Sequence, residues 1–228
     1  MRDKVLVALV MIFALASLGI GYAGAAVVGV GTVTTTTTQT TTVTQTSATQ
    51  NASEPYTLTL VISTGNIYNS TVGDQPAFYV LGQNGLQPAT SISLPAHRLI
   101  KLVIFNYDDG NASLVDPSYA KVNGTTGGTI TFANNDIINS TQTTSGISIV
   151  GAQTVYGVPV DQIAHTFTIP SLGINVPVPV SSAVVATFTL DKSGTFTWFC
   201  MTACGSGADE LGGAMVTPGW MTGSVTVG

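Results

Sequence analysis

Charged side chains are scarce in this sequence. Only 7% of its 228 residues are Asp, Glu, Lys or Arg, against roughly a quarter in an ordinary soluble domain. Four scattered cations beyond Lys4 cannot neutralise a run of phosphates, so we exclude nucleic acid as a partner. Thr, Ser, Asn and Gly replace the missing charges, as expected of a Thr-rich secreted domain or of a protein exposed to strong acid outside the cell. The four basic residues are Arg98, Lys101, Lys121 and Lys192.

Histidine and cysteine are also scarce, which limits the chemistry open to the chain. The sequence contains two residues of each type, His97 and His165, and Cys200 and Cys204. Two cysteines allow one intramolecular disulfide at most. A metal site that requires two imidazoles would have to use both histidines.

A long apolar stretch follows the first charged residues. Arg2 and Lys4 precede an uncharged segment, residues 5–30, which is longer than the roughly 20 residues that cross a bilayer. A positive flank stays in the cytoplasm, so we expect residues 1–30 to form a single anchor in the cell membrane, with the rest of the chain on the extracytoplasmic side. A cleaved signal peptide is the alternative, since Ala23-Gly24-Ala25 offers a small-residue cleavage site.

The next segment, residues 31–54, consists almost entirely of Thr, Gln, Ser and Val. A segment so poor in large apolar residues cannot bury a core, so we expect a disordered, O-glycosylated tether. Sequons in the chain also predict an extracellular glycoprotein. They begin at Asn51, Asn69, Asn111, Asn123 and Asn139.

Residues 55–228 have the pattern of an all-β domain. Short segments rich in β-branched and aromatic residues are separated by clusters of Gly, Pro, Asn and Asp, and none of them has a convincing helical period. Many short strands in one domain predict a sandwich or a barrel. Residues 107–160 are rich in loops and are interpreted as an insertion. The predicted strands are 56–63, 77–81, 99–106, 129–133, 147–150, 165–169, 183–190, 195–200 and 223–227.

The residues best suited to metal binding lie in the last third of the chain. In the segment 194–200, alternation places Phe196, Trp198 and Cys200 on one face of a strand, so the strand ends with a thiol beside two apolar rings. Cys200 and Cys204 form a CxxxCG motif, in which two sulfurs can converge on one centre. Upstream, His165 begins the motif HTFTIPSLG. Thiolates and an imidazole suit copper or zinc, so we expect these three side chains to meet at one pole of the sandwich.

This combination of HTFxxPSLG, GTFTWFC and CxxxCG resembles the copper-A domain of subunit II of haem–copper oxidases. The resemblance covers residues 161–228, and weaker similarity extends back to about residue 92. It implies a Greek-key, cupredoxin-like β-sandwich that follows a single N-terminal transmembrane helix in the chain. It also implies a copper site with bridging thiolates from Cys200 and Cys204, an imidazole from His165 and the backbone carbonyl of Thr202.

The sequence departs from the family at two ligands. The second histidine and the methionine fall at Ala208 and Leu211, so both side chains are missing. Met215 is our candidate for a replacement sulfur ligand. His97 begins a predicted strand whose far end leads to the ligand loops, about 25 Å away, so we assign it a structural or surface role. A pole without metal, with the thiols free or joined in a disulfide, is the alternative.

The resemblance implies an extracytoplasmic, subunit II-like component of a terminal quinol or cytochrome oxidase, with an electron-transfer or structural role and a partly lost copper-A site. Such a chain is at most an accessory subunit of an enzyme and has no catalytic site of its own. The expected partners are the membrane and an oxidase catalytic subunit or another redox protein. One alternative is a sulfocyanin-like, membrane-anchored blue copper carrier, which would need a second histidine. The other is a metal-free surface binding module on the same scaffold.

Overall fold

The computed structural model describes residues 54–65, 75–134, 152–204 and 213–228. The predicted anchor and all but the last residue of the predicted tether lie outside this part, as do Ala208, Leu211 and the predicted strand 147–150. Among the described residues, no helix has both the length and the apolar character of a membrane span.

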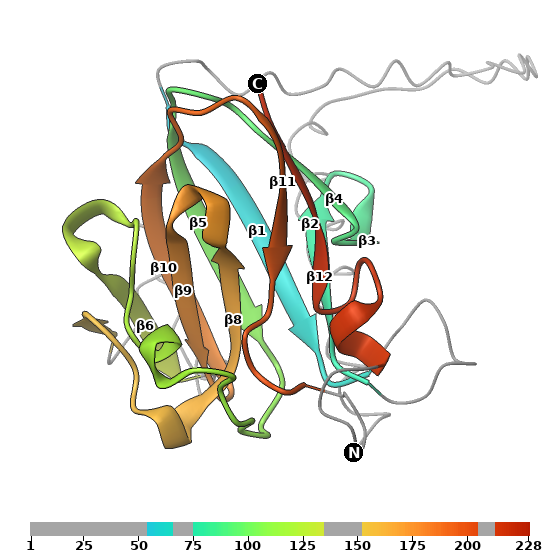
Figure 1. Cartoon of the computed structure of the whole chain (residues 1–228), viewed down its shortest axis with the longest axis vertical. Coiled ribbons are helices and arrows are strands. Elements are labelled where there is room, and N and C mark those ends of the chain that lie inside the picture. Colours follow the sequence, from blue (N-terminus) through green and yellow to red (C-terminus); the bar gives the residue numbers. More distant parts are fainter. Residues whose placement is uncertain (1–53, 66–74, 135–151, 205–212) are drawn as a thin grey trace, which may run out of the picture. The chain divides into compact units, whose positions relative to one another are not determined.

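The described strands form two mixed sheets (Figure 1). In the larger sheet the strand order is β3-β2-β1-β5-β10-β6-β7, and in the smaller it is β4-β12-β11-β8-β9. Each sheet contains one parallel pair, β1 with β5 and β4 with β12, among antiparallel neighbours. The larger sheet comprises β1 (Tyr56–Ser63), β2 (Ala77–Gly82), β3 (Gly85–Pro88), β5 (Leu99–Asn106), β6 (Ile130–Asn134), β7 (Gln153–Val155) and β10 (Ser182–Thr189). The smaller comprises β4 (Ser91–Leu94), β8 (Ile163–Ile169), β9 (Ile174–Pro179), β11 (Gly194–Phe199) and β12 (Thr222–Val227).

Short 3-10 helices occupy several connections between the strands. They are η2 (Pro117–Ala120), η3 (Thr126–Gly128), η5 (Val160–Gln162), η6 (Pro170–Leu172) and η8 (Gly213–Val216). All of these are single turns, so the described part of the chain is an all-β sandwich, as the sequence predicted.

Alternating apolar residues build the core between the two sheets. In β5, Ile100, Leu102 and Ile104 are fully buried, while the residues between them are exposed or half-buried. Aromatic rings join the sheets across the core: Phe78 of β2 lies 5.0 Å from Trp198 of β11, centroid to centroid. The indole nitrogen of Trp198 donates a hydrogen bond to the carbonyl of Ala89, so its one polar atom is satisfied inside the core.

Residues 111–125, within the predicted insertion, pack against β8 and β9. Asn123 pairs with Asn175 of β9. The side-chain amide of Asn175 also donates to the carbonyls of Tyr119 and Lys121, at 2.9 and 2.6 Å. This packing accounts for the burial of every residue of β8 and β9, since a two-layer sandwich alone would bury one face of each strand.

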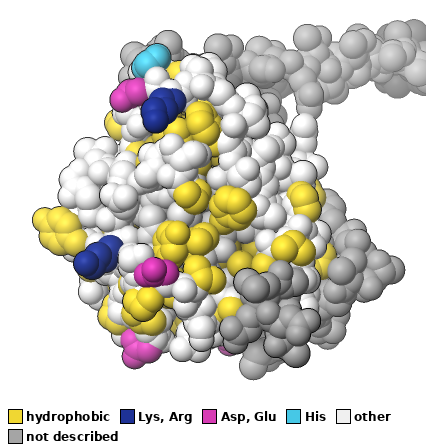
Figure 2. All heavy atoms as spheres, viewed as in Figure 1, with side chains coloured by type: hydrophobic (Ala, Val, Ile, Leu, Met, Phe, Trp, Pro, Cys, Tyr) yellow, Lys and Arg dark blue, Asp and Glu magenta, His cyan; other side chains and the backbone are white. Residues whose placement is uncertain are grey.

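The surface is as poor in charge as the composition indicates. On the face shown in Figure 2, the Lys, Arg, Asp and Glu side chains are few and scattered among neutral and apolar ones. The described residues on this face form no basic stripe.

Gly223→Ala should destabilise the sandwich by about 1–3 kcal/mol. A Cβ at Gly223 would lie 2.5 Å from both the carbonyl oxygen of Ala89 and the indole nitrogen of Trp198. These two atoms are hydrogen-bonded to each other, so neither can move away cheaply. Urea unfolding of the purified chain measures the effect. Gly82→Ala is the matched control, since its Cβ would meet nothing within 4 Å, and an equal loss in both variants would contradict the prediction.

Candidate metal centre

Strand β11 delivers the first thiol to the end of the sandwich. Phe196, Trp198 and Cys200 share one face. Phe196 is half-buried, and Trp198 and Cys200 are buried. The backbone N–H of Cys200 donates to the carbonyl of Met221 at 2.7 Å, which ties the end of β11 to the residue before β12. The alternation predicted from the sequence is confirmed, and it directs the Cys200 side chain inward.

The loop after β11 turns back and brings the second thiol beside the first. The N–H of Cys204 donates to the carbonyl of Thr202 at 2.8 Å, closing a tight turn. The N–H of Ala203 is held by the carbonyl of Ser113, in the segment that packs on β8. Both cysteines are buried and free, with their sulfurs 3.8 Å apart. A disulfide would need a separation of about 2.05 Å, so the structure contains two thiols rather than a bond.

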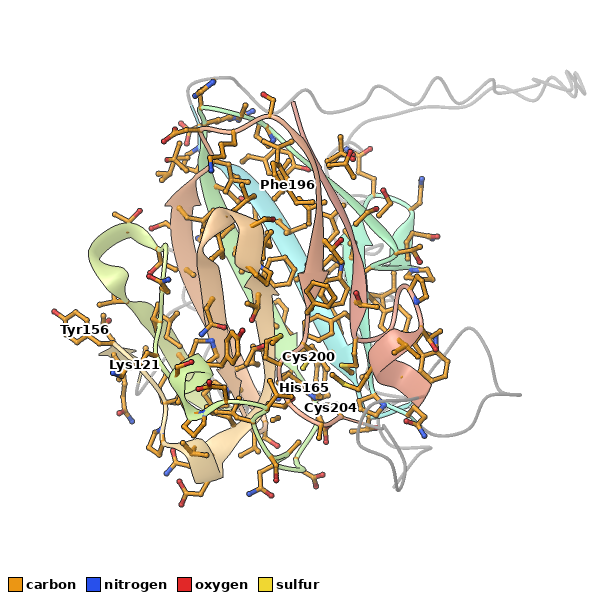
Figure 3. All side chains as sticks on the ribbon, viewed as in Figure 1. Lys121, Tyr156, His165, Phe196, Cys200 and Cys204 are labelled. Atoms are coloured by element: carbon orange, nitrogen blue, oxygen red, sulfur yellow. The ribbon has the colours of Figure 1, made fainter. Side chains whose placement is uncertain are left out.

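His165, on β8, completes the cluster. Its Nδ1 lies 2.9 Å from Sγ of Cys204 and 3.8 Å from Sγ of Cys200, and the side chain is fully buried. The three ligand atoms all lie within 4.8 Å of one another. Figure 3 shows the three labelled side chains gathered at the same end of the sandwich, far from Phe196 near the start of β11. The predicted meeting of one imidazole with two thiols is therefore confirmed.

Thr202 contributes its side chain to this cluster. Its hydroxyl donates to the carbonyl of Ala164 at 2.9 Å, and its Oγ1 also lies 3.0 Å from Sγ of Cys200 and 2.7 Å from Sγ of Cys204. The sequence predicted a ligand role for the backbone carbonyl of this residue, which accepts the N–H of Cys204. Sequence reasoning missed the hydroxyl, although a polar side chain between two cysteines is a visible signal.

Asp108 is the other functional residue that sequence reasoning missed. It follows β5, and its Oδ2 lies 2.9 Å from Nε2 of His165, on the side of the ring opposite the thiols. The sequence signal was present in the segment Asn106-Tyr107-Asp108, which resembles the entry to a ligand loop, but nothing in it indicates which side chain turns inward.

The remaining candidate ligands lie apart from the cluster or have no demonstrated contact with it. His97 precedes β5, at the opposite end of that strand from Asp108, and its side chain is 70% exposed beside Asp191. Its predicted surface role is confirmed. Met215 lies on η8 and packs, half-buried, against the hydrophobic core. Within the described residues it has no recorded contact with either sulfur, so its ligand role stays a prediction.

The pole carries a set of mutually dependent charges. Burial lowers the pKa of His165, but hydrogen bonds to Asp108 and Cys200 outweigh burial and raise it to about 9. Burial raises the pKa of Cys200, but hydrogen bonds from Cys204 and His165 bring it well below its usual range. The hydrogen bond to Cys200 and burial raise the pKa of Cys204. One thiolate, shared by the two sulfurs, therefore faces an imidazolium held by Asp108.

The stability of the metal-free protein should change little between pH 6.5 and about 9. In this range, folded His165 keeps a proton that the unfolded chain has lost, so its contribution falls as the pH rises. Folded Cys200 has already lost a proton that the unfolded chain keeps, so its contribution rises over the same range. The two slopes oppose each other.

The double variant Cys200→Ala/Cys204→Ala removes the rising slope and leaves His165 paired with Asp108. It also removes the contribution of Cys200 to the raised pKa of His165, so its stability should decline above pH 6.5 over a range that ends below pH 9. Urea midpoints measured in the presence of a chelator compare the two proteins. If the urea midpoints of both proteins are equally independent of pH, the pairing of a thiolate with an imidazolium at this pole is contradicted.

The donor set fits copper. Two thiols and an imidazole nitrogen are soft or intermediate ligands, which favour Cu(I) over hard cations such as Mg²⁺ or Ca²⁺. Aromatic rings form part of the surroundings: the rings of Phe78 and His165 are T-shaped with centroids 5.9 Å apart, and Trp198 is fully buried on the same face as Cys200. An apolar surround excludes water and tunes a redox metal.

Comparison with known proteins gives matches among solved structures alone. No family model matches the chain, and no curated protein matches it. The periplasmic domain of subunit II of cytochrome oxidase from Bradyrhizobium japonicum is 13% identical, with 75% of this chain and 83% of that one covered and a TM-score of 0.31. Auracyanin B is 15% identical, with 78% and 93% covered and a TM-score of 0.31. Reduced rusticyanin is 12% identical, with 77% and 81% covered and a TM-score of 0.27.

These three proteins are cupredoxins, the class that the sequence resemblance implied. At such identities and TM-scores, the likeness carries no conclusion about what this chain binds or does. Its function has to be argued from its own residues.

Proposed function

We propose that this chain is a membrane-anchored, extracytoplasmic, subunit II-like component of a terminal oxidase, and that it holds copper between His165, Cys200 and Cys204. The single observation that supports the proposal is the convergence of Nδ1 and both sulfurs within 4.8 Å at a buried pole. The oxidase part of the proposal rests on the sequence resemblance to the copper-A domain. The membrane anchor rests on the apolar residues 5–30.

Bound copper would supply one-electron chemistry, cycling between Cu(I) and Cu(II). The residues of the chain bind it and control its surroundings. The two sulfurs and Nδ1 of His165 would provide the ligand atoms, and loss of the remaining thiol proton and of the Nδ1 proton would accompany binding. The hydroxyl of Thr202 lies beside both sulfurs, at 3.0 and 2.7 Å, and its proton is donated to the carbonyl of Ala164.

A metal-free structural role in the same oxidase is the second candidate. One observation favours it: the polar groups of the pole satisfy one another without an ion. Cys204 and Thr202 both donate to the carbonyl of Ala164, and His165 is hydrogen-bonded at both ring nitrogens. The sulfocyanin-like alternative has less support, because His97 lies at the other end of β5 and cannot supply the second imidazole.

Metal content and association together test the proposal. The full-length chain is purified from its membrane in mild detergent, and copper and haem are measured per chain. Copper near stoichiometry, together with a co-purifying polytopic haem protein, is the expected result. A co-purifying haem protein without copper would favour the structural role. The absence of both the haem protein and copper would overturn the proposal.

Ala208→His combined with Leu211→Met should increase copper uptake. These substitutions restore the residue types that the copper-A resemblance requires at positions 208 and 211, which lie outside the described residues. Copper per chain is measured after reconstitution and removal of loosely bound metal. Ala208→Ser with Leu211→Ile is the control, and equal uptake by both double variants would contradict the prediction.

A further inference from the structure

Hydrogen bonds hold both the backbone and the side chain of Asp108. Its backbone N–H donates to Oδ1 of Asn106 at 3.0 Å, and its carbonyl accepts the N–H of Ser181 at 2.8 Å. Its carboxylate is divided between two donors: Oδ1 accepts the N–H of Gly110 at 2.9 Å, and Oδ2 lies 2.9 Å from Nε2 of His165. The side chain is 18% exposed. A residue with so many fixed contacts can hold another group in one orientation.

The hydrogen bonds that hold Asp108 continue into the sandwich through Asn106. Asn106 is fully buried at the end of β5, and its side-chain amide donates to the carbonyl of Pro179, the last residue of β9, at 2.8 Å. The carboxylate is thereby connected to both sheets, since β5 belongs to the larger sheet and β9 to the smaller.

The carboxylate determines where the ring proton of His165 lies. An ionised carboxylate can only accept a hydrogen bond, so Nε2 of His165 must carry the proton. Nδ1 is then the ring atom that can give up its proton and offer a lone pair to the space beside the sulfurs. A ring turned by 180° would direct a carbon atom towards Asp108 and lose this bond.

We propose that Asp108 is the positioning residue of this centre: it fixes the ring orientation and the tautomer of His165, so that Nδ1 faces Cys200 and Cys204 as a copper ligand. The ligand role rests on the proposed function, whereas the orientation of the ring does not. Outer partners of this kind typically change metal affinity by about 10–100-fold.

Asp108→Asn separates this role from a merely structural one, because it preserves shape and removes one acceptor. If the Asn oxygen keeps the N–H of Gly110, its NH₂ group faces Nε2 of His165. Nε2 must then accept, so the ring keeps its proton on Nδ1 alone, where the proton blocks metal binding. The opposite amide orientation is disfavoured, because it would place the NH₂ group against the N–H of Gly110. Asp109→Asn is the matched control, because Asp109 is the next residue in the chain, is exposed and has no recorded bond to His165.

The test has two readouts on the full-length chain. In the metal-free protein with ¹⁵N-labelled histidine, NMR should detect a slowly exchanging proton on Nε2 of His165 in the wild type and in Asp109→Asn. The Nε2 signal should be lost in Asp108→Asn. In competition with a Cu(I) chelator, Asp108→Asn should bind Cu(I) about 10–100-fold more weakly than Asp109→Asn.

Several results would overturn the inference. These are a wild-type His165 without a protected Nε2 proton, an unchanged Nε2 signal in Asp108→Asn, or equal Cu(I) affinity in the two variants. The wild-type measurement decides the question even if Asp108→Asn fails to fold. A chain that shows the expected NMR pattern but binds no copper would overturn the proposed function and leave the positioning role supported.

Discussion

Cys204→Ser is expected to weaken Cu(I) binding by more than about 100-fold, beyond the loss caused by altering an outer partner of a ligand. The Cys204 sulfur is the one nearer to Nδ1 of His165, at 2.9 Å. A serine hydroxyl is a hard and weakly acidic ligand that cannot replace a thiolate on Cu(I). Competition with a Cu(I) chelator measures the affinity.

The fold should survive this substitution. Serine has nearly the same shape as cysteine, and its hydroxyl can donate to the carbonyl of Ala164, as the thiol does at 3.1 Å. Ala203→Ser introduces the same hydroxyl one residue earlier and serves as the control. If Cys204→Ser keeps the affinity of Ala203→Ser, copper is bound elsewhere.

Trp198→Ala is expected to destabilise the protein by about 3–5 kcal/mol. Trp198 is fully buried, and its ring lies 5.0 Å from Phe78 and 5.7 Å from Phe167, so its removal leaves a cavity between the two sheets. It also removes the donor from the buried carbonyl of Ala89, which adds the cost of an unpaired polar group.

Urea unfolding of the metal-free chain measures this loss. Phe199→Ala is a matched control, because Phe199 is the next residue of β11 and is 38% exposed. We expect it to lose less than about half as much stability as Trp198→Ala. Equal losses would contradict the assignment of Trp198 to the central core.

Local sequence predicted the long strands well. The predicted strands 56–63 and 99–106 match β1 and β5 to the residue, because β-branched and apolar residues fill both segments and turn-forming residues border them. β9 was missed, because Pro177 and Pro179 within it argue against a strand. It is tolerated as the edge strand of the smaller sheet, where a missing N–H breaks no pairing on the open side.

Three other strands were missed for lack of length. β3 and β4 have four residues each and β7 has three, too few for a period to stand out from chance. The turn between β2 and β3 includes Asn84 followed by Gly85, which has a φ of 83°, and an Asn-Gly pair of this kind is a hairpin signal that could have identified β3.

The site was predictable in part. The motifs around His165, Cys200 and Cys204 identified the three residues, because their spacing and residue types are specific. The roles of Asp108 and of the hydroxyl of Thr202 were missed. Their contacts depend on how β5, β8 and the loop after β11 come together, which no local pattern contains. The pairing of Asp108 with His165 spans 57 positions.

Copper K-edge X-ray absorption on the purified full-length chain tests the central claim most directly. We expect sulfur and imidazole nitrogen in the first shell of the metal, with the sulfur signal lost in Cys200→Ser/Cys204→Ser and the imidazole signal lost in His165→Ala. A third sulfur at a longer distance would indicate a methionine ligand, for which Met215 is the candidate. A first shell of oxygen and nitrogen alone, unchanged in these variants, would contradict the account.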